Sequence, residues 1–179
     1  MDSLNAMIAW AAQFFRDPAT FSADEGGVTL LLVGLSISGV AWGFVAGWIA
    51  DAVGAARVLV AAVLALAVVA LVDATAQDRD LALWTTVVLG GLGASGTWLA
   101  GRRMLVDLAP PERLGEYMGL LGITRKASVL GTLLLASLAD SRGWRFAILA
   151  LVVPLVAGAG LLLAAVRRAT PARSNGVLG

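Results

Sequence analysis

The chain has 179 residues, of which 59% are hydrophobic and 14% are charged. Soluble domains are about 45–50% apolar and about 25% charged, so this composition excludes an ordinary water-soluble fold and favours a lipid environment. The net charge of +1 provides no basic surface for nucleic acid. Cysteine and histidine are absent, which excludes disulfides and imidazole metal sites, and we expect no cofactor and no metal.

Five stretches are long and apolar enough to cross a membrane, which requires about 20 residues. They are residues 28–50, 58–76, 81–101, 115–140 and 145–167. None shows the alternation that the strands of a membrane barrel require. The sequence therefore predicts an all-α, polytopic bundle of transmembrane helices over residues 1–169.

The two ends of the chain differ from these stretches. Residues 4–15 are apolar but too few to span, so they predict a partial amino-terminal helix; a segment lying on the membrane surface is the alternative. No basic residue precedes this stretch, so we expect it to belong to the mature chain and not to a signal peptide. Residues 170–179 are predicted to form a polar tail.

Basic residues near the ends of the spans predict the orientation, because cytoplasmic loops are enriched in lysine and arginine. We predict a location in the cell membrane with a cytoplasmic carboxy terminus, because this orientation places the larger group of basic residues on the cytoplasmic side. That inner group is Arg57, Arg102, Arg103, Arg113, Arg167, Arg168 and Arg173, and the outer group is Arg16, Arg79, Arg142 and Arg145.

Glycines recur at helical spacing within the spans, as expected where membrane helices pack closely. We interpret these groups as packing surfaces and not as substrate contacts. They are Gly39, Gly43 and Gly47; Gly90, Gly91, Gly93 and Gly96 together with Ser95; and Gly115, Gly119 and Gly122.

The loop after the first span reads GWIADAVGAAR. Gly47 and Gly54 permit a tight reversal, Asp51 can cap a helix or pair with a cation, and Arg57 anchors the next span. The loop resembles the signature between paired helices of the major facilitator superfamily, where it acts as a cytoplasmic latch between transporter halves. Ordinary loop charges are the alternative interpretation of Asp51 and Arg57.

The run from Gly101 to Gly131 resembles the vacuole effluxer-like branch of that superfamily. The matching elements are Arg102, the turn at 108–110, the group Glu116 to Gly119, Lys126 and Gly131. MDSLNA at the amino terminus is similar to the middle of the family's seventh helix. Thr132, Ala55 and Ala56 depart from the family pattern.

The resemblance covers nearly the whole chain but only the last six of twelve family helices. It implies a carboxy-terminal half of a secondary active transporter that works by alternating access on a small hydrophilic solute. Its partners would be the lipid bilayer and an amino-terminal half or a second copy of this chain. The gating-loop residues that it implies are Gly47, Asp51, Gly54, Arg57, Arg102 and Glu116.

Lys126 is the strongest candidate for contact with a solute. At about 1.5 Å per residue from Tyr117 it lies roughly 13 Å deep, near the midplane, where a charge needs a cavity or a partner. A structural ion pair is the alternative. Arg125 points about 100° away and so faces other surroundings. Thr124 and Ser128, one turn apart, can bond a solute or the adjacent helix.

Two acids are candidates for proton coupling. Asp73 lies near the outer end of its span, and Asp2 lies within the membrane if preceding residues complete the first helix.

Two other functional classes remain open. A membrane scaffold or an inactive remnant of a transporter is one. An intramembrane lipid-modifying enzyme is less favoured. Asp51, Gly54 and Arg57 superficially resemble an acid–glycine–arginine active site, but no second acidic cluster follows at a spacing suited to hold a metal. We therefore expect a non-enzymatic protein.

Overall fold

The computed structural model describes residues 11–169, except for the side chains of residues 108, 121, 124–130, 132 and 166–169. All regular structure in this part of the chain is helical, which confirms the all-α prediction. After a helical segment at 11–16, the helices are α2 (Glu25–Val53), α3 (Ala55–Thr75), α4 (Arg79–Thr85), the π-helix η1 (Thr86–Gly90), α5 (Gly91–Leu108), the 3-10 helix η2 (Pro111–Arg113), α6 (Leu114–Arg142) and α7 (Trp144–Ala169).

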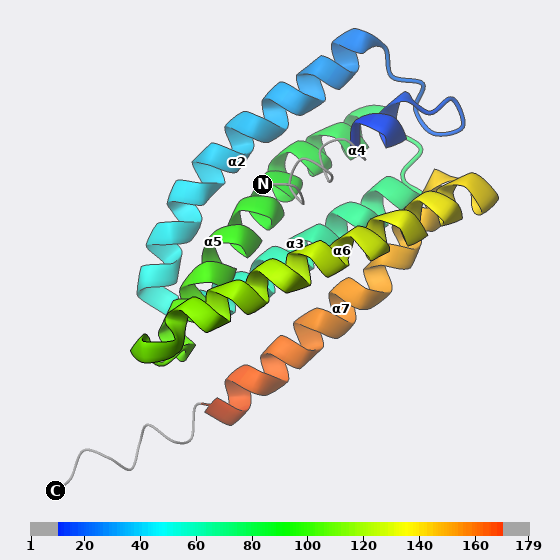
Figure 1. Ribbon diagram of the computed structural model, residues 1–179. Coiled ribbons are helices and arrows are strands. Elements are labelled where there is room, and N and C mark those ends of the chain that lie inside the picture. The colour runs from blue at the N-terminus through cyan, green and yellow to red at the C-terminus, as the bar shows by residue number, and fades with distance from the viewer. Residues whose placement is uncertain (1–10, 170–179) are drawn as a thin grey trace, which may run out of the picture.

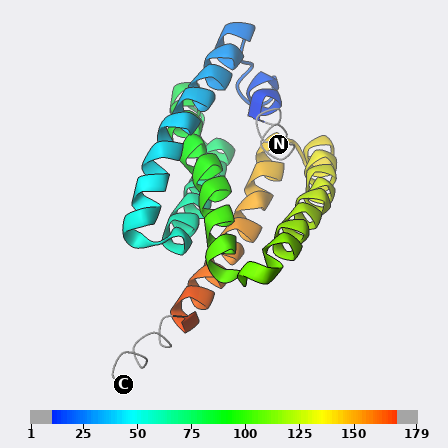
Figure 2. The same cartoon turned by 60° about the vertical axis from the view of Figure 1, so that its left-hand side comes forward.

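The long helices run between two ends of one elongated bundle (Figure 1). α3 packs against α5 and α7, and α2 packs against α5, while α6 packs mainly against α7. Figure 2 shows α6 at the side of the bundle away from α2. α2 and α7 are therefore separated by α3 and α5, and α6 is the most peripheral of the long helices.

Within the described residues, three helices are long and apolar enough to cross a membrane: Glu25–Val53, Ala55–Thr75 and Trp144–Ala165. α6 has the length, but Arg125 and Lys126 stand near its middle. The stretch at 81–101 is divided by η1, where backbone bonds shift from the α to the π pattern.

Single glycines join two pairs of helices. Gly54, with φ of 94°, separates α2 from α3, and Gly143, with φ of 85°, separates α6 from α7. A residue with a Cβ is strained at such positive φ values, which explains why glycine occupies both turns. These glycines make α2–α3 and α6–α7 tight hairpins.

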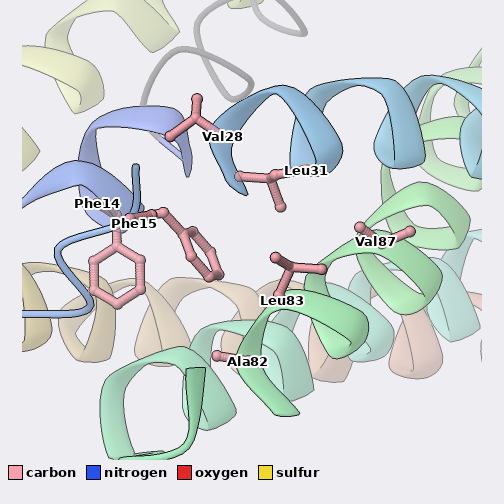
Figure 3. Packing of buried hydrophobic residues seen from close by; sticks show 8 residues of the cluster. Phe14, Phe15, Val28, Leu31, Ala82, Leu83 and Val87 are labelled. Atoms are coloured by element: carbon pink, nitrogen blue, oxygen red, sulfur yellow. The ribbon is translucent and has the colours of Figure 1, made fainter. Parts of the chain in front are cut away.

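Buried apolar residues form one cluster near each end of α2. The first combines Phe14 and Phe15 with Leu31 of α2 and Leu83 of α4, and Figure 3 shows these side chains converging from different segments. The second consists of small and branched residues: Ala46, Ala50, Ala55, Val58, Leu59 and Ala100. The first cluster holds segment 11–16 against the bundle.

Large apolar side chains also cover the outside of the bundle. Phe44 is 79% exposed and Leu161 is 74% exposed. The hydroxyls of Thr29 and Ser36, on the exposed side of α2, donate to carbonyls of their own helix at 2.8 Å. This side of α2 is apolar and its hydroxyls are satisfied internally, as contact with lipid requires.

The glycine group of α5 packs between two helices. A Cβ on Gly91 would collide with Ser38 of α2, and a Cβ on Gly93 would collide with Leu66 of α3. Ser95 donates to the Gly39 carbonyl oxygen at 2.6 Å. By contrast, a Cβ added to the predicted glycine group of α6 would meet no described atom within 4 Å; this group is Gly115, Gly119 and Gly122. The packing interpretation therefore holds within this chain for Gly91, Gly93 and Gly96 of α5.

Replacing Gly93 with valine is expected to destabilise the bundle by about 1–3 kcal/mol, because the added side chain forces α3 away from α5. Gly101→Val is the matched control on the same helix, since a Cβ there meets nothing within 4 Å. Thermal unfolding in detergent measures both variants. Equal losses would show that valine's helix propensity, and not the contact with α3, causes the effect.

Candidate functional sites

Asp73 is a buried carboxylate in the last turn of α3, with only 6% of its surface exposed. The hydroxyl of Thr86 lies 3.0 Å from each carboxylate oxygen. Because a hydroxyl carries a single proton, it donates to one of these oxygens at a time. A buried acid whose described hydrogen-bond donor is a neutral hydroxyl differs from a solvated loop charge and is typical of functional positions in membranes.

The contact depends on the interruption in the following helix. Thr86 is the first residue of η1, and the π pattern continues to Gly90. Single π-turns inside α-helices are frequent at functional sites, because they alter which residues face a neighbouring helix. η1 and Asp73 thus form one polar position in an apolar region.

Arg145 of α7 forms hydrogen bonds at the end of α3, close in sequence to Asp73. Its Nη1 donates to the carbonyl oxygens of Ala76 at 2.7 Å and Ala74 at 3.4 Å. Its guanidinium also lies 5.4 Å from the ring centroid of Phe21. Arg145 therefore satisfies carbonyls that the helix leaves free and joins α7 to α3 and to the loop before α2.

At the opposite end, Asp51 in the last turn of α2 pairs with Arg103 of α5. Arg57 instead donates to the Val53 carbonyl oxygen at 3.4 Å, at the end of α2. Gly54 supplies the positive φ of the turn between them. The loop signature thus has its acid bonded to α5 and its arginine bonded to α2.

The other predicted gating-loop residues have separate surroundings. Arg102 lies with its guanidinium 4.0 Å from the Trp98 ring centroid. Glu116 is exposed in the first turn of α6. A Cβ on Gly47 would lie 3.8 Å from Leu99, an ordinary contact between α2 and α5.

A double-mutant cycle is expected to show coupling between Asp51 and Arg103 but none between Asp51 and Arg102. Asp51→Asn, Arg103→Gln and Arg102→Gln supply the variants, with unfolding free energy as the measurement. Both partners of the pair are partly exposed, so the expected coupling is under about 1 kcal/mol. Coupling of Asp51 to Arg102 in place of Arg103 would contradict this arrangement.

A second ion pair lies at the other end of α2, where it joins the start of α2 to the start of α4. Arg79 Nη2 lies 3.2 Å from Asp24 Oδ1, and the same oxygen caps α2 by accepting from the Gly27 N–H at 3.1 Å. The Gly27 bond and then Arg79 lower the pKa of Asp24 below its ordinary value of 3.8. A lowered folded-state pKa means that this carboxylate's contribution to stability is present at neutral pH and is lost as pH falls through that pKa.

These ion pairs lie at opposite ends of a 29-residue helix. At 1.5 Å per residue, α2 is about 44 Å long, compared with about 30 Å for a hydrocarbon core and about 40–45 Å for a whole bilayer. The charges of both pairs therefore lie at the level of the headgroups when α2 crosses a membrane.

The remaining predicted site residues lie outside the described part of the chain. They are Asp2 and the side chains of Thr124, Arg125, Lys126 and Ser128. The backbone of residues 124–128 is described and belongs to the middle of α6.

Sequence reasoning missed two partners, Thr86 and Arg103. Thr86 has a signal in the sequence, because it is a polar residue within an apolar stretch that follows Asp73 after a short connection. Arg103 stands next to Arg102, and the sequence alone does not indicate which of two adjacent arginines faces α2.

The apolar helices and their lipid-compatible exterior define an integral membrane protein of the helical class. The family model of the Major Facilitator Superfamily matches residues 2–178. The chain belongs to this superfamily.

A curated relative supports the same assignment. The chain is 31% identical over 131 residues to a probable 4-methylmuconolactone transporter of Cupriavidus pinatubonensis. The match covers 70% of this chain and 29% of the relative, so the matched part of the chain corresponds to less than a third of that protein's length. No solved structure matches the chain.

Proposed function

We propose that this chain forms the carboxy-terminal half of a secondary active transporter that moves a small solute by alternating access. The membership of the superfamily is the observation that carries this proposal. The name of the relative adds support for transport, and the coverage of 29% fits a partial transporter. The vacuole effluxer-like branch is the proposed subgroup, on the elements between Gly101 and Gly131.

The proposed assembly contains five full spans and a partial helix from this chain. The helical stretch from Arg79 through η1 to Leu108, and α6, supply the two spans beyond the three most apolar helices. An amino-terminal half or a second copy completes the cavity. We propose a location in the cell membrane with the carboxy terminus in the cytoplasm.

We propose solute contact for Lys126, assisted by Thr124 or Ser128, and proton coupling for Asp73. Lys126 lies near the middle of the 29-residue α6, so its backbone is close to the bilayer midplane when α6 spans. The burial of Asp73 beside Thr86, with no ion pair to a described cation, supports a carboxyl group that exchanges a proton.

The ion pair between Asp51 and Arg103 is the proposed gate contact on the cytoplasmic side. It is partly exposed and joins the ends of α2 and α5. An exposed ion pair is weak in water. Breaking this pair and replacing it with contacts to another half therefore costs little free energy when the two halves rock.

Flux into proteoliposomes tests the proposal, with the chain co-reconstituted with its amino-terminal half. The first solute is 4-methylmuconolactone, because the relative's name includes it, and amino acids form the second group. Each is measured with and without a pH gradient. We expect saturable uptake that the gradient accelerates. Flux equal to that of empty liposomes for every solute would favour the scaffold alternative.

A further inference from the structure

Three arginines at the end of the bundle where α2 and α5 terminate have different surroundings. Arg103 pairs with Asp51, and Arg57 donates to the last turn of α2. Arg102 makes no ion pair with a carboxylate in the described part of the chain, and its guanidinium lies over the ring of Trp98. Arg102 is exposed, so its charge faces the surroundings of the bundle.

Two exposed tryptophans lie at nearly the same depth near this end. Trp48 of α2 precedes Asp51 by about one turn, and Trp98 of α5 precedes Arg103 by slightly more. Their exposed fractions are 76% and 46%. Because the Asp51–Arg103 pair fixes the level of both helices, the tryptophans mark one plane. Exposed tryptophan is enriched where the hydrocarbon of a bilayer meets the headgroups.

The stacked position of Arg102 leaves it able to bind a phosphate. Its guanidinium centre lies 4.0 Å from the Trp98 centroid, so the cation rests against the ring. The N–H donors lie at the edges of the guanidinium plane, and this fork matches two phosphate oxygens. The ring thus orients the cation without neutralising it.

We propose that Arg102 and Trp98 form a binding site for the headgroup of an anionic phospholipid. The phosphate accepts hydrogen bonds from Arg102, while the acyl chains extend along the apolar exterior toward the level of Phe44. That exterior begins with Trp48, within one turn of the headgroup level.

A lipid fits these observations better than a free phosphate ion. The cation stands where an exposed apolar surface begins, and a soluble anion gains nothing from that surface. Electrostatic attraction to an anionic leaflet contributes in addition, because a basic residue near such a surface is favoured. The inference rests on membrane insertion and not on transport, so lipid binding and solute flux can fail independently.

Lipid binding is tested on the full chain in nanodiscs of phosphatidylcholine, alone or with added phosphatidylglycerol. Native mass spectrometry counts the phosphatidylglycerol that stays bound, and thermal unfolding gives the stabilisation. Arg102→Gln is expected to weaken phosphatidylglycerol binding at least about tenfold, because it loses charge-assisted hydrogen bonds to the phosphate in addition to the general attraction of a basic residue to an anionic surface. Trp98→Leu is expected to weaken it as well, because the guanidinium is no longer oriented.

Arg142→Gln is the matched control. Arg142 also lies over an aromatic ring, 5.1 Å from the centroid of Phe146, but at the opposite end of the bundle. It is expected to weaken retention of phosphatidylglycerol by less than Arg102→Gln does, because it loses only the general attraction of a basic residue to an anionic surface. Unchanged retention in Arg102→Gln, or an equal loss in Arg142→Gln, would overturn the proposal. Stabilisation by inorganic phosphate in phosphatidylcholine nanodiscs, if it requires Arg102, would instead assign the site to a soluble anion.

Discussion

Replacing Lys126 with alanine is expected to reduce solute uptake at least about tenfold in the complete transporter. A charged hydrogen bond to a solute contributes about 1.5–3 kcal/mol, and 1.4 kcal/mol corresponds to a factor of ten in affinity. Initial rates of uptake in proteoliposomes measure the effect, with the amount of folded protein in the membrane determined in parallel. Lys126→Arg keeps the charge and is expected to retain part of the activity.

Arg142→Ala provides the comparison within the same helix. Arg142 stands in the last turn of α6, over Phe146 and far along the helix from Lys126. It is expected to transport normally. Normal uptake in Lys126→Ala together with a low yield of folded protein would assign Lys126 to a structural ion pair, and the proposed solute contact would then be wrong.

Replacing Asp73 with asparagine is expected to abolish the acceleration of uptake by a pH gradient while exchange of solute across the membrane continues. Asparagine keeps the size of the side chain and accepts from Thr86, but it carries no exchangeable carboxyl proton. Gradient-driven uptake and solute exchange are measured on the same vesicles. Gradient-driven uptake equal to the unmodified protein's would remove Asp73 from the coupling mechanism.

Thr86→Val separates the role of the contact from that of the carboxyl group. Loss of the hydroxyl leaves a buried carboxyl group without its described donor, which is expected to destabilise the bundle by about 1–3 kcal/mol. Thr75→Val is the matched control, because the Thr75 hydroxyl is exposed and donates to its own helix at 2.7 Å. The difference between the two unfolding free energies isolates the contact with Asp73.

The helical class was predictable because it depends on composition and on the lengths of apolar runs, which lipid constrains strongly. The interior of the bundle was less predictable. The π pattern at Thr86 involves backbone bonds that no residue type specifies, so the burial of Asp73 beside a hydroxyl was not foreseen.

The choice between two adjacent arginines illustrates a second limit. Consecutive helical residues point about 100° apart, so the rotation of α5 decides whether Arg102 or Arg103 meets Asp51. That rotation is determined by close contacts elsewhere, such as Ser95 donating to the Gly39 carbonyl oxygen. A sequence pattern indicates that an arginine is present at this level but does not define the rotation of its helix.

The glycine turns at 54 and 143 have a mechanical consequence. A single residue connects the two helices of each hairpin. This short connection limits sliding of α2 along α3 and of α6 along α7. Displacement of one helix of a hairpin therefore also displaces the other helix. Relative movement of the two hairpins within this chain is therefore expected in the segment that connects them, at α4, η1 and α5, and a rigid crosslink inserted there is expected to arrest that movement.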